Sequence, residues 1–232
     1  MISVGYDFFK RKGVLENVHK FGSNSGLTSA GFETLWSAGG LYPWASLDTP
    51  QTLYVSSTIA GDNGDVIVSG LDSNWNELTE TVSLAGSPSE VTTTSLFRRV
   101  FRMEYSDTNA GTITARTVSH AGTVVGQIEI EKAQSLMAIY TIPAGHQGYL
   151  LNYTLGTGKN EDATCEIYFR NIGQNFRIKN EGQVYQNSFT QQFPIPLSIG
   201  EKSDIDFRAI TTNAGGGSCF VNFDLVLFKY EK

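Results

Sequence analysis

Cysteine is scarce in this 232-residue sequence, which contains only Cys165 and Cys219. Two cysteines are too few for the disulfide framework that stabilises many small secreted domains. Each lies inside an alternating apolar run, so we expect two buried free thiols. A bridge between them is the alternative, and it requires that their two strands face each other. The fold must therefore depend on a hydrophobic core, for which 40% hydrophobic residues suffice.

Long hydrophobic runs and positive charge are also in short supply. Uninterrupted apolar stretches, such as 136–140 and 225–228, are only a handful of residues long, whereas a membrane-spanning helix needs roughly 20. Seventeen Lys and Arg oppose 23 Asp and Glu, and the net charge of −6 disfavours binding to nucleic acid or anionic lipid. No basic segment followed by an apolar one begins the sequence, so no secretory signal is indicated. We expect no membrane span, no nucleic-acid partner, and folding in a cytoplasm.

Histidine and nucleophile motifs are missing as well. His19, His120 and His146 lie in unrelated segments and form no His-x-x-x-His pair. The sequence also has no Gly-x-Ser-x-Gly motif and no phosphate-binding loop. We therefore predict no catalytic residue, no cofactor and no metal site.

Two groups of carboxylates require a separate judgement. Asp62 and Asp65 lie in a turn with Asp72 nearby, but the glutamate that completes an EF-hand loop is absent. A solvated turn is therefore favoured over a calcium site. Asp204 and Asp206 project to one face of a strand, as glycosidase carboxylates can, yet such pairs normally come from separate elements. A structural role is favoured for them too.

The chain does contain many segments in which apolar and polar residues alternate. Residues 97–105 place apolar side chains on one face, and Arg99 falls among them, so it needs a partner or a strand end. After residue 131, about seven or eight strands follow with turn signals every 8–12 residues, as in a jelly roll. The last of these, 219–228, is so apolar on one face that we expect it to be a central strand.

These patterns predict an all-β chain in three parts. Residues 1–30 form an extended arm, because they are rich in Gly, Ser and Asn and show no sustained hydrophobic periodicity of a strand or a helix. Residues 31–130 form a small β domain. Residues 131–232 form a jelly-roll-like antiparallel β-sandwich.

Aromatic residues are the candidates for partner contact. Trp36, Tyr42 and Trp44 occur within nine residues and either bind a partner or cover this chain's own core, the second interpretation being favoured. Trp75 lies in the polar loop 72–77, which makes it the best candidate for a surface contact. The full set of candidate contact residues is Phe8, Phe9, Phe21, Trp36, Tyr42, Trp44 and Trp75.

Four segments, 21–25, 32–43, 64–77 and 135–150, resemble in order and spacing a family of small virion structural proteins of tailed bacteriophages with marine and cyanobacterial hosts. The individual motifs are loose, but the resemblance covers most of the chain. It implies a component of a virus particle, leaves its place in the particle open, and carries no catalytic residues.

The expected function is therefore that of a non-enzymatic virion protein. The leading hypothesis is a capsid decoration or cement protein that forms a homo-oligomer, with a trimer favoured, and binds the major capsid protein or other virion proteins. Such proteins stabilise a shell by burying surface across subunit boundaries. The alternatives are a tail or head-to-tail connector component, and a host-glycan-binding module that uses Trp36, Trp44 or Trp75.

Overall fold

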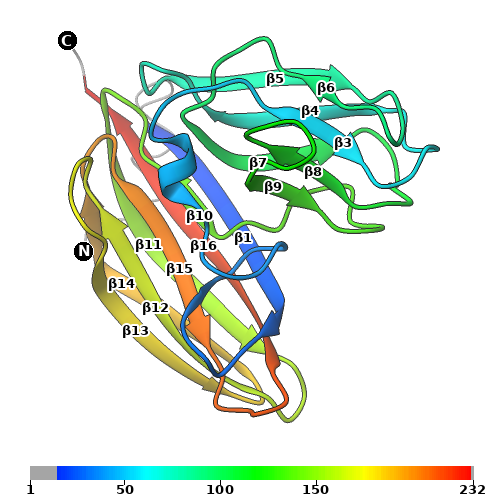
Figure 1. Cartoon of the computed structure of the whole chain (residues 1–232). Helices are drawn as coiled ribbons and strands as arrows, with labels where there is room; N and C mark the ends of the chain where they lie inside the picture. Colours follow the sequence, from blue (N-terminus) through cyan, green and yellow to red (C-terminus); the bar gives the residue numbers. More distant parts are fainter. Residues whose placement is uncertain (1–14, 231–232) are drawn as a thin grey trace.

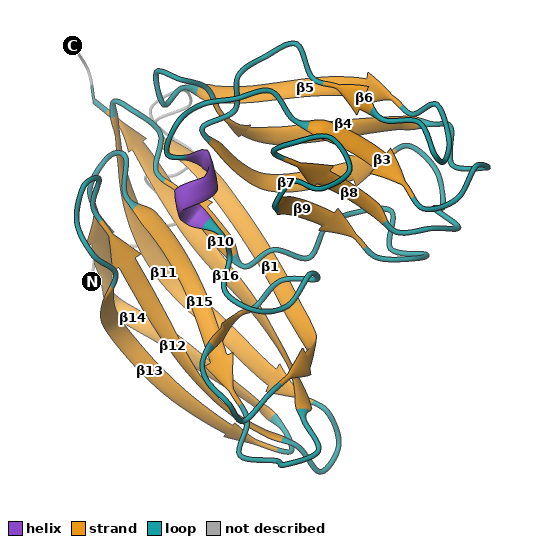
Figure 2. Ribbon diagram, viewed as in Figure 1, coloured by secondary structure: helices purple, strands orange, loops and turns teal. Residues whose placement is uncertain are grey.

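The computed structural model describes residues 15–230, and this part of the chain is all-β, as predicted (Figures 1 and 2). Every strand pairing is antiparallel. No helix in this range is long and apolar enough to cross a membrane. The elements are β1 (Leu15–Leu27), β2 (Glu33–Thr34), the 3-10 helix η1 (Trp44–Leu47), β3 (Tyr54–Ser57), β4 (Asp65–Leu71), β5 (Glu77–Ser83), β6 (Val91–Thr92), β7 (Arg99–Tyr105), β8 (Ile113–Arg116), β9 (Val124–Ile128), β10 (Ile139–Thr141), β11 (His146–Thr157), β12 (Asp162–Arg170), β13 (Arg177–Tyr185), β14 (Ser188–Ile199), β15 (Asp204–Ile210) and β16 (Gly217–Lys229).

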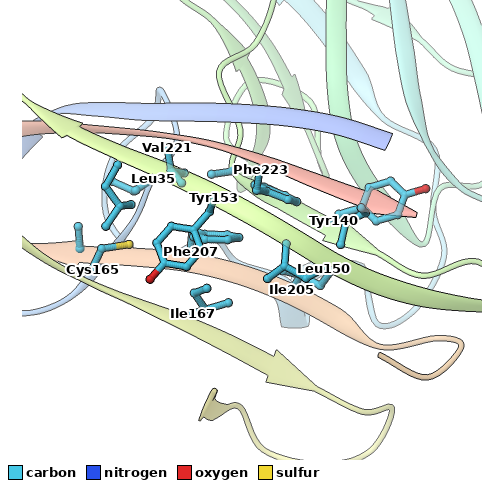
Figure 3. Close-up of a cluster of buried hydrophobic side chains, with 14 of the residues drawn as sticks. Leu35, Tyr140, Leu150, Tyr153, Cys165, Ile167, Ile205, Phe207, Val221 and Phe223 are labelled. Atoms are coloured by element: carbon cyan, nitrogen blue, oxygen red, sulfur yellow. The ribbon is translucent and has the colours of Figure 1, made fainter. Parts of the chain in front are cut away.

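Both ends of the described chain belong to one unit, which we call the terminal unit. Its sheet A has the order β1-β16-β11-β14, and its sheet B has the order β10-β15-β12-β13, with β2 added beside β15. The two sheets share one hydrophobic core, and Figure 3 shows its centre, where Tyr153, Phe207 and Phe223 lie between the sheets. The rings of Phe207 and Phe223 are stacked with centroids 4.6 Å apart.

A second unit, the inserted unit, is formed by strands β3 to β9. Its sheet C has the order β6-β3-β8-β9 and its sheet D the order β5-β4-β7. A separate core, which includes Val66, Phe97 and Met103, lies between these sheets. The insertion leaves the terminal unit after β2 and returns at β10 (Figure 1). The boundary that we expected near residue 130 falls between β9 and β10.

The expected arm over residues 1–30 is wrong from Leu15 onward. Residues 15–27 form β1, which pairs with β16 along almost its whole length, from Leu15 opposite Phe228 to Leu27 opposite Gly217. The reason is that β1 completes sheet A with a partner about 200 residues away in the chain, and such a pairing leaves no local signal. The first 14 residues lie outside the described range.

Strand β16 is central, as predicted, because it lies between β1 and β11. Its alternate residues from Cys219 to Leu227 are buried in the core. Cys165 on β12 and Cys219 are both buried free thiols, which confirms the favoured expectation. Burial raises the pKa of both thiols, that of Cys219 to about 12, so neither is a reactive thiolate at neutral pH.

The segment between β2 and β3 fastens the two units together. Trp36, Tyr42 and Trp44 pack edge to face in series, with centroids 5.1 and 4.8 Å apart, over Ile139 on the outer side of sheet B. The Tyr42 hydroxyl lies 3.1 Å from the carbonyl oxygens of both Val100 and Val125 in the inserted unit. This aromatic cluster covers part of the outer face of sheet B and fixes the position of the insertion.

Candidate functional site

Asp204 lies at the contact between the two units. It belongs to β15 and is only 1% exposed. Its carboxylate accepts hydrogen bonds from Arg99 Nε on β7 at 2.8 Å, Arg170 Nε on β12 at 2.8 Å, and Thr141 Oγ1 on β10 at 2.6 Å. A buried charge is tolerated only when it is paired and hydrogen-bonded in this way. Asp204 therefore joins three strands from both units.

Arg99 uses all five of its N–H donors at this contact. Nε and Nη2 reach Asp204 at 2.8 and 3.2 Å, and Nη2 also reaches Asp48 Oδ1 at 3.1 Å. Nη1 donates to the carbonyl oxygens of Leu47 and Arg98. Burial lowers the pKa of Arg99, but the contacts with Asp204, together with the charge of Asp48, offset this and leave the pKa above its usual value. Arg99 was expected to have a partner or to lie at a strand end, and both hold, because it pairs with Asp204 and is the first residue of β7.

Asp206 follows on the same side of β15 and is fully buried. It accepts hydrogen bonds from Trp44 Nε1 at 2.9 Å, Arg208 Nε at 2.8 Å and Thr34 Oγ1 at 2.9 Å. Burial raises the pKa of Asp206, although Arg208 opposes this shift. The oxygens of Asp204 and Asp206 thus serve contacts inside this chain, which supports the structural role over a catalytic pair.

The predicted contact residues Trp36, Tyr42 and Trp44 are buried inside the chain. They belong to the aromatic cluster described above, and the Trp44 indole is bonded to Asp206. They were candidates for contact with a partner or for covering this chain's own core, and the structure places them in the core. Their burial follows from the insertion, which packs directly on them.

Trp75 is also buried, with 7% of its surface exposed, and this corrects the expectation of a surface contact. It occupies the turn before β5 with φ of 67°. The guanidinium carbons of Arg98 and Arg99 lie 4.9 and 5.1 Å from its ring centroid. Because the backbone of Ala144 also donates to the Trp75 carbonyl, this loop is held against the terminal unit.

A cavity of about 410 Å³ remains at the contact between the two units. We call it the junction cavity. Trp75, Arg98 and Arg99 of the inserted unit line it together with Arg170 and Asp204 of the terminal unit, and Asp48 lines it from the connecting segment.

The outer side of sheet A is different, because no described element packs over it. We call it the open face, and the pairing register assigns to it Asn17, His19, Phe21, Asn152, Thr154, Thr190, Gln192, Phe220, Asn222 and Asp224. His19 Nδ1 and Asn152 Nδ2 lie 2.7 and 3.0 Å from the two oxygens of Asp224. The Phe220 ring lies against Gly156, where an added Cβ would be only 2.2 Å from the ring. Phe21 is thus the predicted contact residue that the structure places on the open face, where it is half-buried, while Phe8 and Phe9 lie outside the described residues.

Strand β14 forms one edge of sheet A beside the open face. Between Gln192 and Leu197 it carries four residues opposite the single Leu151 of β11, and two of the four are Pro194 and Pro196. Between these prolines Ile195 is 84% exposed. Bulges and prolines on an edge strand block uncontrolled pairing with other strands.

Asp62, one of the carboxylates considered for calcium, is hydrogen-bonded within the chain. Its carboxylate accepts from Ser57 Oγ at 2.5 Å and from the backbone N–H groups of Ala110 and Gly111. Within the described range, no three His, Cys, Asp or Glu side chains are placed to hold a metal ion.

Sequence reasoning missed the two arginines Arg98 and Arg170 and the open-face network around Asp224. Arg98 and Arg99 form an adjacent pair at the start of an apolar strand, which was a usable signal. Arg170 and Asp224 carry none, because their partners come from strands far away in the sequence.

No protein-family model and no curated protein matches the chain. Similar solved structures include the insecticidal delta-endotoxin Cry8Ea1 from Bacillus thuringiensis, with 10% identity, a TM-score of 0.25, and coverage of 88% of this chain and 55% of that chain. The PBSX exported protein XepA has 11% identity and a TM-score of 0.21, with coverage of 92% and 86%. The VP2 subviral particle of infectious bursal disease virus has 10% identity and a TM-score of 0.22, with coverage of 93% and 76%. The chain spans about half of the endotoxin chain, and these TM-scores are too low to support an argument about function.

Proposed function

We propose that the terminal unit is a jelly roll that carries the inserted unit between its first and second strands. Numbering β1 as strand 1 and β10 to β16 as strands 2 to 8 turns the order of sheet A into 1-8-3-6 and that of sheet B into 2-7-4-5. This order supports the assignment, because a jelly roll consists of eight antiparallel strands in two sheets with two Greek keys. The short β2 is an addition beside strand 7.

We further propose that the chain is a non-enzymatic structural protein of a bacteriophage particle. The observation that carries this is the strand order, because jelly rolls recur in viral capsid proteins, lectins and cupins. The cupin alternative requires a cavity inside the sandwich, whereas here apolar side chains such as Leu150, Tyr153 and Phe207 fill the space between the sheets. The resemblance to tailed-phage virion proteins favours the particle over the lectin.

The open face is the surface on which the proposed protein binds its neighbours. It combines a ladder of polar residues with an exposed Phe220 and a half-buried Phe21, a mixture typical of protein interfaces. The proposed role is capsid decoration or cementing by a homo-oligomer, for which a trimer is favoured. The neighbour is the major capsid protein or another virion protein.

Particle binding tests this proposal. Deleting residues 1–30 is unsuitable, because it removes β1 and with it one edge of sheet A. The better variant is Thr154→Arg, which adds charge and bulk to the centre of the open face. We expect it to stay folded and to lose binding to particles that lack the protein, measured by cosedimentation. The matched control is Thr81→Arg on exposed β5 of the inserted unit, which should bind as the unmodified chain does. Equal binding by all three proteins would remove the open face from the proposal.

In the tail or connector alternative, a protein with the same fold is present in only a few copies per particle. Quantitative mass spectrometry of purified virions separates the two, because the copy number of a decoration protein follows that of the repeated shell subunits, whereas a connector component is present in few copies. The glycan-binding alternative loses its original basis, since Trp36, Trp44 and Trp75 are all buried.

A further inference from the structure

One buried polar atom in the described range lacks a partner. It is Nε of Arg98, the single buried side-chain nitrogen or oxygen among residues 15–230 with no hydrogen bond. Folded proteins leave few such groups, and each needs an explanation. Arg98 lines the junction cavity, where its Nη1 donates to the carbonyl oxygen of Asp48 at 2.6 Å. Nε itself has almost no exposed surface, so a ligand in the cavity reaches Arg98 through its terminal nitrogens, of which Nη2 donates to no described residue.

The cavity carries an excess of positive charge. Three guanidinium groups, those of Arg98, Arg99 and Arg170, face two carboxylates, those of Asp48 and Asp204. The difference is 3 − 2, or one positive charge. Asp204 already accepts from Arg99, Arg170 and Thr141, so it does not neutralise Arg98. A single carboxylate is the group that balances this charge and accepts from the terminal nitrogens of Arg98.

The remaining wall is suited to hydroxyl groups. The side chain of Asp48 is 56% exposed and Gln174 lies beside it in the lining, so both supply acceptors for a hydroxylated ligand. The Asp48 charge also disfavours a dianion such as sulfate or phosphate. The volume of about 410 Å³ is within the usual range for small-molecule sites, roughly 300–1,000 Å³.

We propose that the junction cavity binds a small hydroxylated monocarboxylate, the chemistry of a sugar acid, with its carboxylate on Arg98. Trp75 forms a wall of the site, with its ring beside the Arg98 guanidinium. This site does not depend on the particle role, because it uses the contact between the units and not the open face.

Calorimetric titration of the full chain with glucuronate tests the site, with glucose as the neutral match and sulfate as the simple anion. We expect saturable glucuronate binding and affinities at least about tenfold weaker for glucose and sulfate. Tryptophan emission should change with the same midpoint. In Trp75→Phe that emission change should disappear while heat is still released.

The decisive variants are at Arg98. Arg98→Gln removes the charge, and Arg98→Lys keeps the charge but removes the planar guanidinium donors. Both should weaken glucuronate binding by about tenfold or more. Arg102→Gln, an arginine of β7 that does not line this cavity, should bind as the unmodified chain does.

Thermal unfolding shows which variants keep the fold, and Arg98→Lys decides the matter if Arg98→Gln unfolds. Absence of glucuronate binding would overturn the proposal. So would equal affinity for sulfate and glucuronate, or unweakened binding by a folded Arg98→Lys variant.

Discussion

The outer faces of sheets A and B carry similar side chains, but they differ in what lies over them. On sheet B, Asp204 and Asp206 project outward from β15, and on sheet A, Asn222 and Asp224 project outward from β16. The first pair is buried under the connecting segment and the inserted unit, whereas the second pair remains on the open face. The same alternating pattern therefore gives an internal anchor in one sheet and a free polar surface in the other.

This difference changes the energetic role of each carboxylate. Asp204 and Arg99 have lost their water, so each depends on the other and on the surrounding donors. Asp224 has solvent beside it, and its pairing with His19 contributes little to stability. Buried pairs such as Asp204 and Arg99 favour one relative position of the two units over others, because any shift leaves a charge without a partner.

Replacing Asp204 and Asp224 one at a time should give the largest difference in the free energy of unfolding between the two faces. Asp204→Ala leaves the Arg99 guanidinium buried without its main counter-ion and should lower the free energy of unfolding by about 3–5 kcal/mol. Asp224→Ala should lower it by less than about 1 kcal/mol. Chemical denaturation of both variants measures the contrast. Equal losses would mean that the network at the contact between the units is not as dry as its geometry indicates.

Lys20 gives a smaller effect that depends on pH. Its side chain turns inward from β1, where burial and then the positive charge of Arg102 lower its pKa to about 7, while Glu104 acts in the opposite direction. Between pH 7 and 9 the unfolded chain binds a proton at this lysine that the folded chain does not, so stability rises with pH.

Comparison with Lys20→Met isolates this contribution, because both proteins share all other titrating groups. From pH 7 to pH 9, the unmodified chain should gain about 2 kcal/mol of stability relative to Lys20→Met. Denaturant midpoints at several pH values provide the measurement. A constant difference between the two proteins across this range would show that Lys20 keeps its proton in the folded state.

Removing one hydroxyl group from each region, the contact between the units and the open face, should give the smallest difference in stability. Tyr42→Phe removes the hydroxyl that bonds to carbonyl oxygens of the inserted unit, and should cost about 1 kcal/mol. Thr154→Val removes a hydroxyl 3.0 Å from that of Thr190 on the open face, and should change stability by less than about 0.5 kcal/mol. Thermal unfolding of the two variants resolves the difference. A larger loss from Thr154→Val would mean that the open face is covered in solution.

Part of this structure could be read from local pattern. The alternation in 219–228 predicts a buried central strand, because a long apolar edge would aggregate, and β16 occupies that position. Arg99 among apolar residues predicts a partner or a strand end, and Arg99 both pairs with Asp204 and begins β7. In both cases the chemical type of the side chain determines which surroundings it needs in the folded protein.

Strand β1 shows why the rest could not be read in this way. The positions that alternate onto its inner side are Glu16, Val18, Lys20, Gly22 and Asn24, a set with only one large apolar residue. At Gly22 an added Cβ would lie 2.2 Å from the Ala138 backbone nitrogen and 2.4 Å from the Leu35 carbonyl oxygen. The backbones of two other segments therefore lie directly against Gly22. The inner side of β1 is polar and contains glycine, whereas the local pattern of a buried strand would require apolar side chains there.

The sequence by itself determined that this protein is built of strands, most of them with one apolar face, because the alternation of residue types acts over a few neighbouring positions. Only the tertiary structure decided that the first described strand pairs with the last, that the tryptophans are covered, and that Arg98 faces a cavity. These features depend on contacts between segments far apart in the chain. Burial, and with it the strength of every charge interaction, is a property of that assembled arrangement.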